Sequence, residues 1–397
     1  MYRLSVAPVF GAALCRGIVA RLMHILLAAC GFLVATAYAS ESPEPTLGQV
    51  QVTEVVSGLK HPWSLAFLPD GSLLITEQPG QLRRLSPDGQ LSAPIDGVPQ
   101  VAARGQGGLL EVLPSPDFDS DRFVYLSYAE SDGRNAGTAV GRGRLSDDFT
   151  RLEGFTVLFR QSPKLSSGHH FGGRMVFNED GMLYVALGEN NQRPTAQDLD
   201  KHQGTIIRIH PDGTVPHDNP FIEQTGALPE IWSYGHRNPQ GLAFNPWTGE
   251  LWEHEHGPRG GDEINIVRPG LNYGWPRATY GINYSGFAIP EAEGNTVPGT
   301  EPPLMWWRKS PAVSGMAFYN NDRFPEWNGS LFVGALAQRV LLRLSLDGNR
   351  VVAEERLLHE RRDRIRDVRQ GPDGFVYVLV DDAPGALLRL QPARVAQ

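Results

Sequence analysis

Short segments of alternating apolar and polar residues recur along this chain, and a turn interrupts most of them. The clearest example reads AFLPDGSLLI at residues 66–75, where apolar segments flank Asp70 and Gly71. Asp-Gly between such segments is a strong signal for a β-hairpin, because both residues tolerate the backbone angles of a tight turn. The pattern therefore predicts a strand, a turn and a second strand.

This pattern returns several times. Residues 175–185, 242–252 and 369–378 repeat it clearly, and residues 115–126 and 324–333 repeat it more weakly. The copies lie roughly 45 to 80 residues apart, with no persuasive amphipathic helix between them. Repeats of this length that consist of hairpins are typical of propeller blades, whereas a β-sandwich lacks a recurring blade motif. We therefore expect an all-β fold, a six-bladed β-propeller that forms a single domain.

The first 39 residues differ in character from the rest. Their only charges are arginines, residues 25–37 are almost wholly apolar, and residues 37–39 read AYA, a cleavage site of the small-x-small type. These features are typical of a secretory signal peptide, and the apolar segment is too short to favour a membrane span. A lipoprotein signal that ends at Cys30 is the alternative. We prefer cleavage after Ala39, because apolar residues continue past that cysteine.

This organisation predicts a signal peptide at residues 1–39, an N-terminal linker at 40–54 and the propeller at 55–392, in a periplasmic or secreted protein. Both cysteines lie in the first 39 residues, so neither disulfides nor thiol chemistry is expected in the mature chain. The 44 acidic residues all follow residue 40, and they outnumber the 36 basic ones. Such a negative charge argues against nucleic acid or an anionic membrane as a partner.

Polar motifs adjoin several of the predicted strands. GHHFGGRM (168–175) combines adjacent histidines with a glycine pair and Arg174. YGHRNPQG (234–241) carries hydrogen-bonding side chains at a density that a solvated loop rarely needs, and its Arg237 could bind a carboxylate through two parallel hydrogen bonds. RGQGGLL (104–110), taken alone, is most simply a turn.

Two other segments could hold a metal ion. His254 and His256 would share one face of a strand, a spacing compatible with zinc, but no third nitrogen or sulfur ligand is evident nearby. Asp262 and Glu263, followed by LNYGWP (271–276), offer oxygen ligands of the kind that calcium prefers. From spacing alone, a solvated acidic loop explains these residues equally well.

Residues 361–367, RRDRIRD, form a charged segment directly before the last repeat. Charged segments of this kind are usually solvated. Arg364 and Arg366 would nevertheless point to the same side of an extended strand, where two guanidinium groups could hold a polyanionic ligand.

In this order and spacing, the motifs resemble those of the soluble aldose sugar dehydrogenases that use pyrroloquinoline quinone, which belong to the glucose/sorbosone dehydrogenase family. The resemblance covers about residues 55–390. The motifs that carry it are LKHPWSLAFLPDG, GQGGLLEV, HHFGGRM, YGHRNPQGLAF, EHGPRGGDEIN with LNYGWP, and RIRDVRQGPDG.

The resemblance implies a quinoprotein that oxidises the C1 hydroxyl of aldoses to lactones, with His170 as the catalytic base. It implies a cofactor with three carboxylates and two calcium ions, one beside the cofactor and one structural. The implied cofactor-binding residues are Gln106, Arg237, Asn238, Ala337, Arg364 and Arg366. The implied calcium ligands are the backbone carbonyls of Gly257 and Pro258 at the cofactor, and Glu263 and Tyr273 at the structural site.

The chain departs from the soluble glucose dehydrogenases at one of these positions, because Ala337 stands where they have a cofactor-binding lysine. It also lacks long insertions, so we expect an open cleft and a broad specificity for sugars. No Cys-x-x-Cys-His haem motif is present, and electrons are therefore expected to pass to an external quinone or cytochrome. The expected assembly is a monomer or a homodimer.

Two other functions fit a six-bladed propeller. A calcium-dependent lactonase or esterase would explain the oxygen ligands and a central histidine, but not three arginines that converge on one site. A non-catalytic propeller that binds carbohydrate or protein would keep the fold without the cofactor. The fold alone does not distinguish these functions.

Overall fold

The computed structural model describes residues 50–392. These residues belong to a unit that runs from Ala39 to Gln397, and we describe that unit by itself. The predicted signal peptide, the alternative lipidation at Cys30 and cleavage after Ala39 lie outside the described residues. No helix within residues 50–392 is long and apolar enough to cross a membrane.

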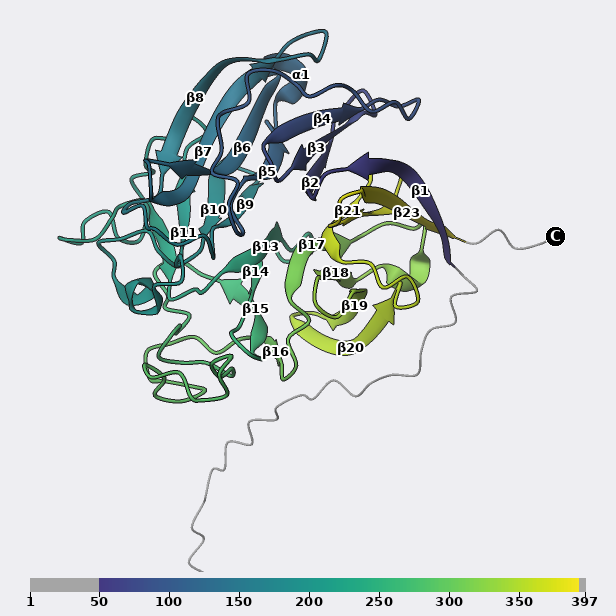
Figure 1. Cartoon of the computed structure of the whole chain (residues 1–397). Helices are drawn as coiled ribbons and strands as arrows, with labels where there is room; N and C mark the ends of the chain where they lie inside the picture. The colour runs from purple at the N-terminus through teal and green to yellow at the C-terminus, as the bar shows by residue number, and fades with distance from the viewer. Residues whose placement is uncertain (1–49, 393–397) are drawn as a thin grey trace, which may run out of the picture. The chain divides into compact units, whose positions relative to one another are not determined.

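Six antiparallel sheets surround a common centre, and each contributes one inner strand to it (Figure 1). Neighbouring inner strands pack against each other, and the last packs against the first, so the ring is closed. The inner strands are β2 (Pro62–Phe67), β5 (Leu109–Pro114), β9 (Gly172–Phe177), β13 (Pro239–Phe244), β17 (Val313–Tyr319) and β21 (Ile365–Gln370). The predicted six-bladed β-propeller is confirmed.

Each blade continues outward from its inner strand. The second strands are β3 (Leu73–Glu77), β6 (Phe123–Ser131), β10 (Leu183–Leu187), β14 (Leu251–Glu255), β18 (Ser330–Ala335) and β22 (Val376–Val380). The third strands are β4 (Gln81–Leu85), β7 (Ala136–Leu145), β11 (Thr205–Ile209), β15 (Asp262–Val267), β19 (Val340–Asp347) and β23 (Gly385–Pro392). The outer strands are β1 (Val50–Leu59), β8 (Leu152–Arg160), β12 (Ile231–Tyr234), β16 (Met305–Trp307) and β20 (Arg350–Leu357).

Three short helical segments accompany these strands, namely α1 (Phe118–Asp121), η2 (Arg193–Gln197) and η3 (Pro325–Trp327). The repeated hairpin turns, such as the one at Asp70 and Gly71, connect each inner strand to the second strand of its blade. They therefore all lie at the end where the inner strands finish. The opposite end, where the inner strands begin, gathers the longer connections between blades.

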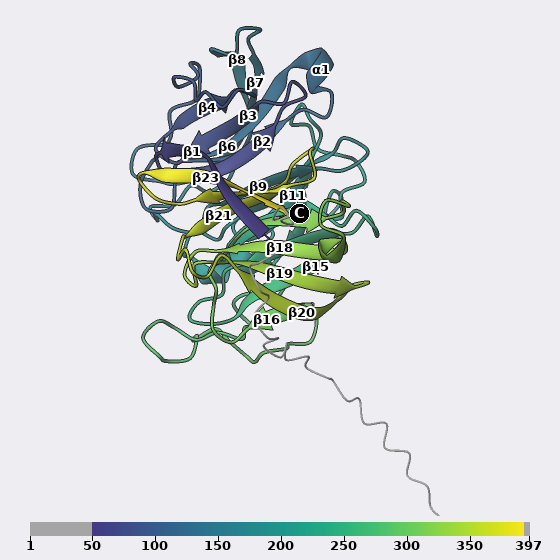
Figure 2. The same cartoon turned by 90° about the vertical axis from the view of Figure 1, so that its right-hand side faces the viewer.

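One boundary differs from the prediction. Strand β1 begins at Val50 and pairs with β23, from Val50 opposite Pro392 to Leu59 opposite Gly385. The first described strand thus completes the blade formed by the last part of the chain, as the side view shows (Figure 2). Residues 50–54 are therefore strand, and the prediction that the linker extends to residue 54 is wrong, because backbone pairing with the distant C-terminal strand holds them.

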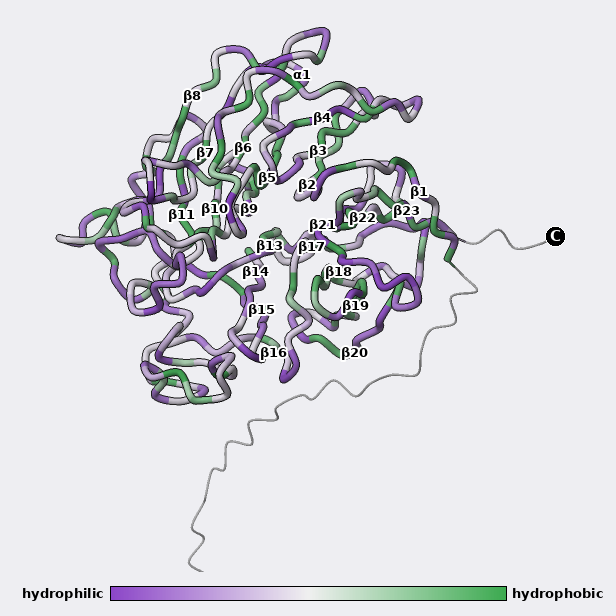
Figure 3. Tube along the Cα trace, viewed as in Figure 1, coloured by the Kyte–Doolittle hydropathy of each residue, from purple (hydrophilic) through white to green (hydrophobic). Residues whose placement is uncertain are grey.

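The core lies between neighbouring blades, where hydrophobic residues follow the strands while many of the connections are hydrophilic (Figure 3). Close to the centre the inner strands leave little room. A Cβ atom added to Gly241 would lie 2.4 Å from His254 Nε2, and one added to Gly315 would lie 2.4 Å from Asp367 Oδ1. Small residues in the inner strands therefore let six strands converge, and this convergence brings the beginnings of all six strands together.

Candidate active site

A cavity of about 540 Å³ opens at the end of the propeller where the inner strands begin. Residues at or just before the start of all six inner strands line it. Of the residues predicted to bind a cofactor, the cavity wall includes Gln106, Asn238, Ala337, Arg364 and Arg366. The structure therefore brings together, at one place, residues that are up to 260 positions apart in the chain.

His170 lies directly before β9, beside two cavity-lining residues, Phe171 and Gly172. Its backbone has φ of 54°, and its N–H donates a hydrogen bond to Gln106 Oε1 at 2.7 Å. A buried histidine in this left-handed conformation is strained, and strain of this kind is found mostly where surrounding contacts hold it for a function. The hydrogen bond that the His170 N–H donates to Gln106 is one such contact.

The ring of His170 is oriented by Glu189, because Nδ1 lies 2.8 Å from Glu189 Oε2. A carboxylate at Nδ1 favours the tautomer with the proton on Nδ1, which leaves the Nε2 lone pair free to accept a proton. Burial lowers the pKa of His170, the positive charge of Arg237 lowers it further, and Glu189 opposes both. The imidazole is therefore neutral at pH 7, which is the state that a general base requires.

Glu189 was not predicted from the sequence. It follows β10, and a hydrogen bond from the backbone N–H of Asn190 to the carbonyl of His170, at 3.1 Å, ties the two segments together. A Cβ atom added to Gly188 would lie 2.0 Å from the same carbonyl. The close approach of the two backbones therefore requires glycine at 188, and GEN at 188–190 was the only local sign of this contact.

Arg364 and Arg366 stand on the cavity wall as predicted, and both contact Asp381. Their Nη2 atoms lie 3.1 Å and 3.4 Å from Asp381 Oδ2, while His61 Nδ1 lies 3.0 Å from Oδ1. Burial raises the pKa of Asp381, but Arg366, His61 and Arg364 together hold it below its usual value, so it is ionised. One carboxylate thus serves two guanidinium groups, and the wall keeps a surplus positive charge for an anionic ligand.

Arg174 does not line the cavity. Its Nη1 atom lies 2.9 Å from Glu111 Oε2 and 3.0 Å from Asp367 Oδ1, and Nε donates to the carbonyl of Gln240 at 2.7 Å. Its guanidinium carbon is 4.1 Å from the ring centre of Trp63, which does line the cavity. Arg174 therefore connects four blades and supports the aromatic wall instead of gripping a ligand directly.

Arg237 and Asn238 are fixed through their backbones, because both N–H groups donate to Glu255 Oε2. Asn238 lines the large cavity, and its Oδ1 accepts a hydrogen bond from Gly172 at 3.2 Å. Arg237 instead lines a small adjacent cavity of about 10 Å³, and its Nη1 donates to the carbonyl of His256 at 2.9 Å. His256 lines both cavities and separates them.

Ala337 lies on the exposed turn between β18 and β19, and its N–H donates to the carbonyl of Pro311 at 3.0 Å. It contributes a methyl group and backbone to the cavity wall, but no charge. Arg364 Nη1 donates a hydrogen bond to the carbonyl of Leu336, in the same turn, at 3.3 Å. The positive charge at this side of the cavity therefore comes from β21 and not from the β18–β19 turn.

The segment that contains Gly257 and Pro258 follows β14 and is buried. Asp262 holds it in place, since Oδ1 accepts a hydrogen bond from Gly257 N–H at 2.9 Å and Oδ2 accepts one from Ala312 N–H at 2.8 Å. Gly257 lines the small cavity together with Glu263. Of the residues predicted for the two calcium sites, Gly257 and Glu263 therefore line the same small cavity, whereas Pro258 and Tyr273 are not among its lining residues.

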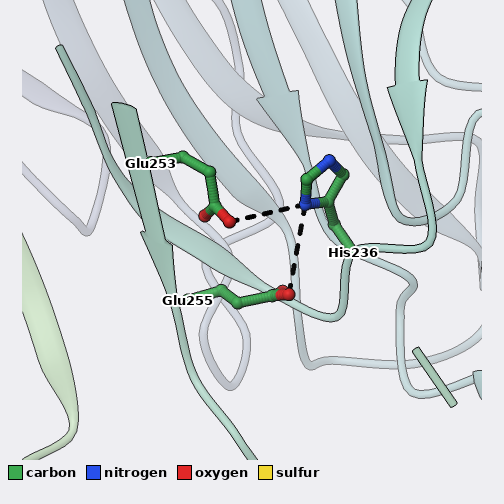
Figure 4. Close-up of side chains that lie close together, drawn as sticks. All are labelled: His236, Glu253 and Glu255. Carbon is green, nitrogen blue, oxygen red and sulfur yellow. Dashed lines mark ion pairs between the residues drawn. The ribbon is translucent and has the colours of Figure 1, made fainter. Parts of the chain in front are cut away.

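Three buried glutamates and a histidine gather at this cavity, and Glu255 and Glu263 line it. His236 Nδ1 lies 3.5 Å from Glu253 Oε1 and 4.0 Å from Glu255 Oε1 (Figure 4). Glu263 faces Glu255 across the β14–β15 pair. Burial raises the pKa of Glu253 and of Glu263 to about 8, and burial together with Glu253 raises that of Glu255 well above its ordinary value.

This carboxylate cluster fits a cation. Within the described residues, Glu253 Oε2 and His236 Nδ1 have no hydrogen-bond partner although both are buried. Buried carboxylates without a counter-charge are costly, and a bound divalent ion would remove that cost. The hydroxyl of Tyr273 donates to the carbonyl of Ile266 at 2.7 Å and accepts from the N–H of Arg268 at 2.8 Å, so it is engaged with the backbone of β15 and the residue that follows it.

The two histidines considered as zinc ligands, His254 and His256, have different surroundings. His254 is fully buried, and His256 Nε2 lies 2.6 Å from the carbonyl of Val313, to which it donates. Among residues 50–392, the grouping of possible metal ligands is His236 with Glu253 and Glu255, which point to the other face of β14. From their spacing in the sequence, the histidines of this strand were considered as metal ligands, whereas its glutamates, Glu253 and Glu255, were not.

A cavity lined by arginines, with a buried histidine–glutamate pair at its edge, at the end of a six-bladed propeller, defines a candidate redox or hydrolytic site of the propeller enzymes. Residues 59–389 match the family described as Glucose / Sorbosone dehydrogenase, and the chain belongs to that family. The protein is therefore an oxidoreductase, and the resemblance stated from the sequence is confirmed.

Individual relatives agree with this assignment. The chain is 58% identical over 345 residues to the aldose sugar dehydrogenase YliI of Escherichia coli K12, covering 86% of this chain and 93% of that protein. A crystal structure of the soluble aldose sugar dehydrogenase of E. coli in the apo form aligns with a TM-score of 0.85 and 57% identity, over 87% of this chain and all of that one. The aldose sugar dehydrogenase of Streptomyces coelicolor, solved in its PQQ-bound form, aligns with a TM-score of 0.71 and 29% identity, over 88% of this chain and all of that one.

Proposed function

We propose that this protein oxidises the C1 hydroxyl of aldose sugars to the lactone, using pyrroloquinoline quinone as the hydride acceptor and passing the electrons to an external carrier. The observation that carries the proposal is the His170–Glu189 pair, which adjoins the lining residues Phe171 and Gly172 of a cavity that is also lined by Arg364 and Arg366. The relatives described above, which are aldose sugar dehydrogenases, support the substrate class, and the PQQ-bound relative supports the cofactor.

The cavity fits the proposed cofactor in size and charge. Its volume, about 540 Å³, is in the range of small-molecule and cofactor sites. Arg364 and Arg366 would hold carboxylates of the cofactor, and Gln106 and Asn238 would supply amide contacts. When bound, the quinone would accept the hydride from C1 of the sugar, a transfer that no amino-acid side chain can perform.

The chain supplies the proton acceptor. His170 Nε2 would take the proton of the C1 hydroxyl, and Glu189 would stabilise the imidazolium that forms. Glu189 also prevents rotation of the ring, because its Oε2 bonds to both Nδ1 and the N–H of Asn191. The proton is thus held at one defined atom while the hydride leaves from the adjacent carbon.

Calcium completes the proposal. Glu253, Glu255 and Glu263 offer oxygen ligands, the type that calcium prefers, and the carbonyls of Gly257 and Pro258 belong to the adjacent segment. An ion next to the cofactor would polarise it as a Lewis acid. The signal-like residues 1–39 support the further proposal that the protein acts in the periplasm or outside the cell.

Reconstitution tests the function. Protein purified without cofactor would be mixed with calcium and pyrroloquinoline quinone, and dye reduction followed with a panel of aldoses. We expect activity that requires both additions, is retained in His169→Gln and falls at least about 100-fold in His170→Gln, the loss typical of a missing general base. His169 is the matched control because it is adjacent but exposed. Hydrolysis of lactones by the cofactor-free protein would favour the lactonase function instead.

A further inference from the structure

Exposed basic side chains surround the mouth of the cavity. They lie on the connections at the end of the propeller where the inner strands begin, and none of them forms an ion pair within residues 50–392. We call this set the cationic rim; it consists of Lys60, Arg104, Arg134, Arg259, Arg308, Lys309, Arg339 and Arg362. Exposed carboxylates on connections at this end, such as Asp132, Asp200, Glu360 and Asp382, are fewer, and Asp200 pairs with Lys201, so unpaired basic residues predominate there.

The rim is joined to the cavity wall but is not part of it. Arg339 is two residues after the cavity-lining Ala337, and the Lys309 carbonyl accepts a hydrogen bond from Gln338 Nε2 at 2.8 Å. Arg339 Nη1 donates to the carbonyl of Arg362 at 2.9 Å. No rim residue lines the cavity itself. A ligand that fits inside the cavity therefore does not need these charges, whereas a larger body at its mouth would contact them.

The opposite end of the propeller is different. There most arginines near the hairpin turns pair with carboxylates, as Arg144 does with Asp147 at 3.0 Å and Arg151 with Glu153 at 3.1 Å. Arg323 is the exception, because its Nε donates to the carbonyl of Asp373 at 3.1 Å. The chain as a whole is acidic, with 44 acidic and 36 basic residues. Unpaired positive charge is thus concentrated at the end that bears the cavity, against the overall balance of the protein.

An apolar element accompanies the charge. Tyr284 and Phe287 are 75% and 77% exposed on the connection between β15 and β16, and Ile282 is 41% exposed. Tyr284 lines the cavity mouth, and the carbonyl of Ile282 accepts a hydrogen bond from Arg259 N–H at 2.9 Å. Exposed aromatic residues next to arginines are typical of the energetically dominant part of protein–protein interfaces.

We propose that the cationic rim and this aromatic segment form the docking surface for a redox protein with an acidic surface, which takes electrons at the cavity mouth. The proposal rests on the proposed dehydrogenase function. Oxidation of one aldose to its lactone releases two electrons and two protons. Two one-electron carriers in succession each remove one electron, and the protons leave to solvent. Opposite charges would speed the encounter of the two proteins and orient the carrier toward the cavity.

The test compares two variants with the same change in net charge. The rim variant carries Arg308→Gln, Lys309→Gln, Arg339→Gln and Arg362→Gln. The control variant carries Arg144→Gln, Arg151→Gln, Arg323→Gln and Arg350→Gln, at hairpin turns of the opposite end. Each reconstituted enzyme would be assayed with an aldose and three acceptors: succinylated cytochrome c, which is acidic, native cytochrome c, which is basic, and uncharged ubiquinone-0.

For the wild-type enzyme we expect the second-order rate constant with succinylated cytochrome c to exceed that with native cytochrome c and to fall as salt is added. The rim variant should lose at least about tenfold of this rate at low ionic strength, and the control variant should stay within about twofold of wild type. All three enzymes should reduce ubiquinone-0 equally. Equal losses in the rim and control variants, or a matching loss with ubiquinone-0, would overturn the proposal.

Equilibrium binding separates this proposal from the dehydrogenase function. If no acceptor is reduced, the dehydrogenase function fails, and sedimentation of the protein with succinylated cytochrome c still reports docking. Binding that the rim variant loses and the control variant keeps supports the docking surface. Binding of phosphatidylglycerol vesicles that depends on the rim, without binding of succinylated cytochrome c, would refute it and assign the rim to a membrane surface.

Discussion

The contact between His170 and Glu189 offers the sharpest test of the catalytic arrangement, through the substitution Glu189→Gln. The amide would keep the geometry, because its oxygen can replace Oε2, which accepts from His170 Nδ1 and from Asn191 N–H. Its NH2 group would take the place of Oε1, which has no partner within the described residues. The substitution therefore removes the negative charge while the ring stays in position.

The size of the effect follows from the charge of the hydrogen bond. A hydrogen bond to a charged group contributes about 1.5–3 kcal/mol and a neutral one about 1 kcal/mol, so stabilisation of the imidazolium should fall by about 0.5–2 kcal/mol. That difference corresponds to a decrease in kcat of roughly 2- to 30-fold. KM for the sugar should not change, because Glu189 is not among the residues that line the cavity.

The pH dependence should also change in a defined direction. Glu189 raises the pKa of His170 against burial and Arg237, so its loss lowers that pKa further. The base must be neutral to act, and the acid limb of kcat/KM should therefore move to lower pH while the plateau falls. A plateau that stays within twofold of wild type, or an acid limb that moves to higher pH, would refute this reasoning.

Glu230→Gln is the matched control, because Glu230 forms a similar hydrogen bond to a histidine away from the cavity, with Oε1 2.7 Å from His202 Nε2. We expect this variant to keep both kcat and the pH profile of the wild type. Thermal unfolding of both variants would show whether either substitution disturbs the fold.

Three other predictions concern stability. Calcium should raise Tm more at pH 8 than at pH 6, because burial raises the pKa of Glu253 and Glu263 to about 8 and the ion must displace their protons; equal increases would contradict the assignment. Gly188→Ala should lower the free energy of unfolding by about 1–3 kcal/mol in urea titrations, since its Cβ would overlap the carbonyl of His170, and an unchanged midpoint would disprove that contact. Arg174→Met should cost about 3–5 kcal/mol in the same titration, because the two buried carboxylates Glu111 and Asp367 would then share the single charge of Arg369; a loss below about 1 kcal/mol would show that the network is dispensable.

The blades could be predicted from the sequence because their signal is local. Asp-Gly and related turns lie between the two strands that they connect, and the apolar alternation of those strands is visible within ten residues. The closure of the ring was not predictable in this way. Val50 pairs with Pro392, and neither strand has a sequence feature that identifies the strand with which it pairs. The predicted boundary at residue 55 was therefore placed inside β1.

In the candidate site too, residues in local motifs could be predicted and their distant partners could not. Arg364, Arg366, Asn238 and Gln106 were found because each belongs to a recognisable local motif, and the structure places all four on one cavity wall. Their partners come from other segments. Asp381 follows β22 and reaches the arginines only through the pairing of β21 with β22.

The buried glutamates were missed for a related reason. Strand alternation places Glu253 and Glu255 on one face of β14 and His254 on the other, and the sequence does not reveal which face meets His236. Only the packing of β14 against its neighbours decides that the acidic face is enclosed. A cation site of this kind depends on burial, which spacing alone cannot supply.

Single-turnover reduction of the bound cofactor tests the role of His170 as the proton acceptor most directly. The reconstituted enzyme would be mixed with an aldose, unlabelled or deuterated at C1, and the cofactor spectrum followed by stopped flow without any acceptor. The account predicts slower reduction of the cofactor with the deuterated sugar, and reduction at least about 100-fold slower in His170→Gln than in His169→Gln, with equal cofactor binding in both. Reduction at the wild-type rate in His170→Gln would show that another group accepts the proton and would contradict the proposed role of His170.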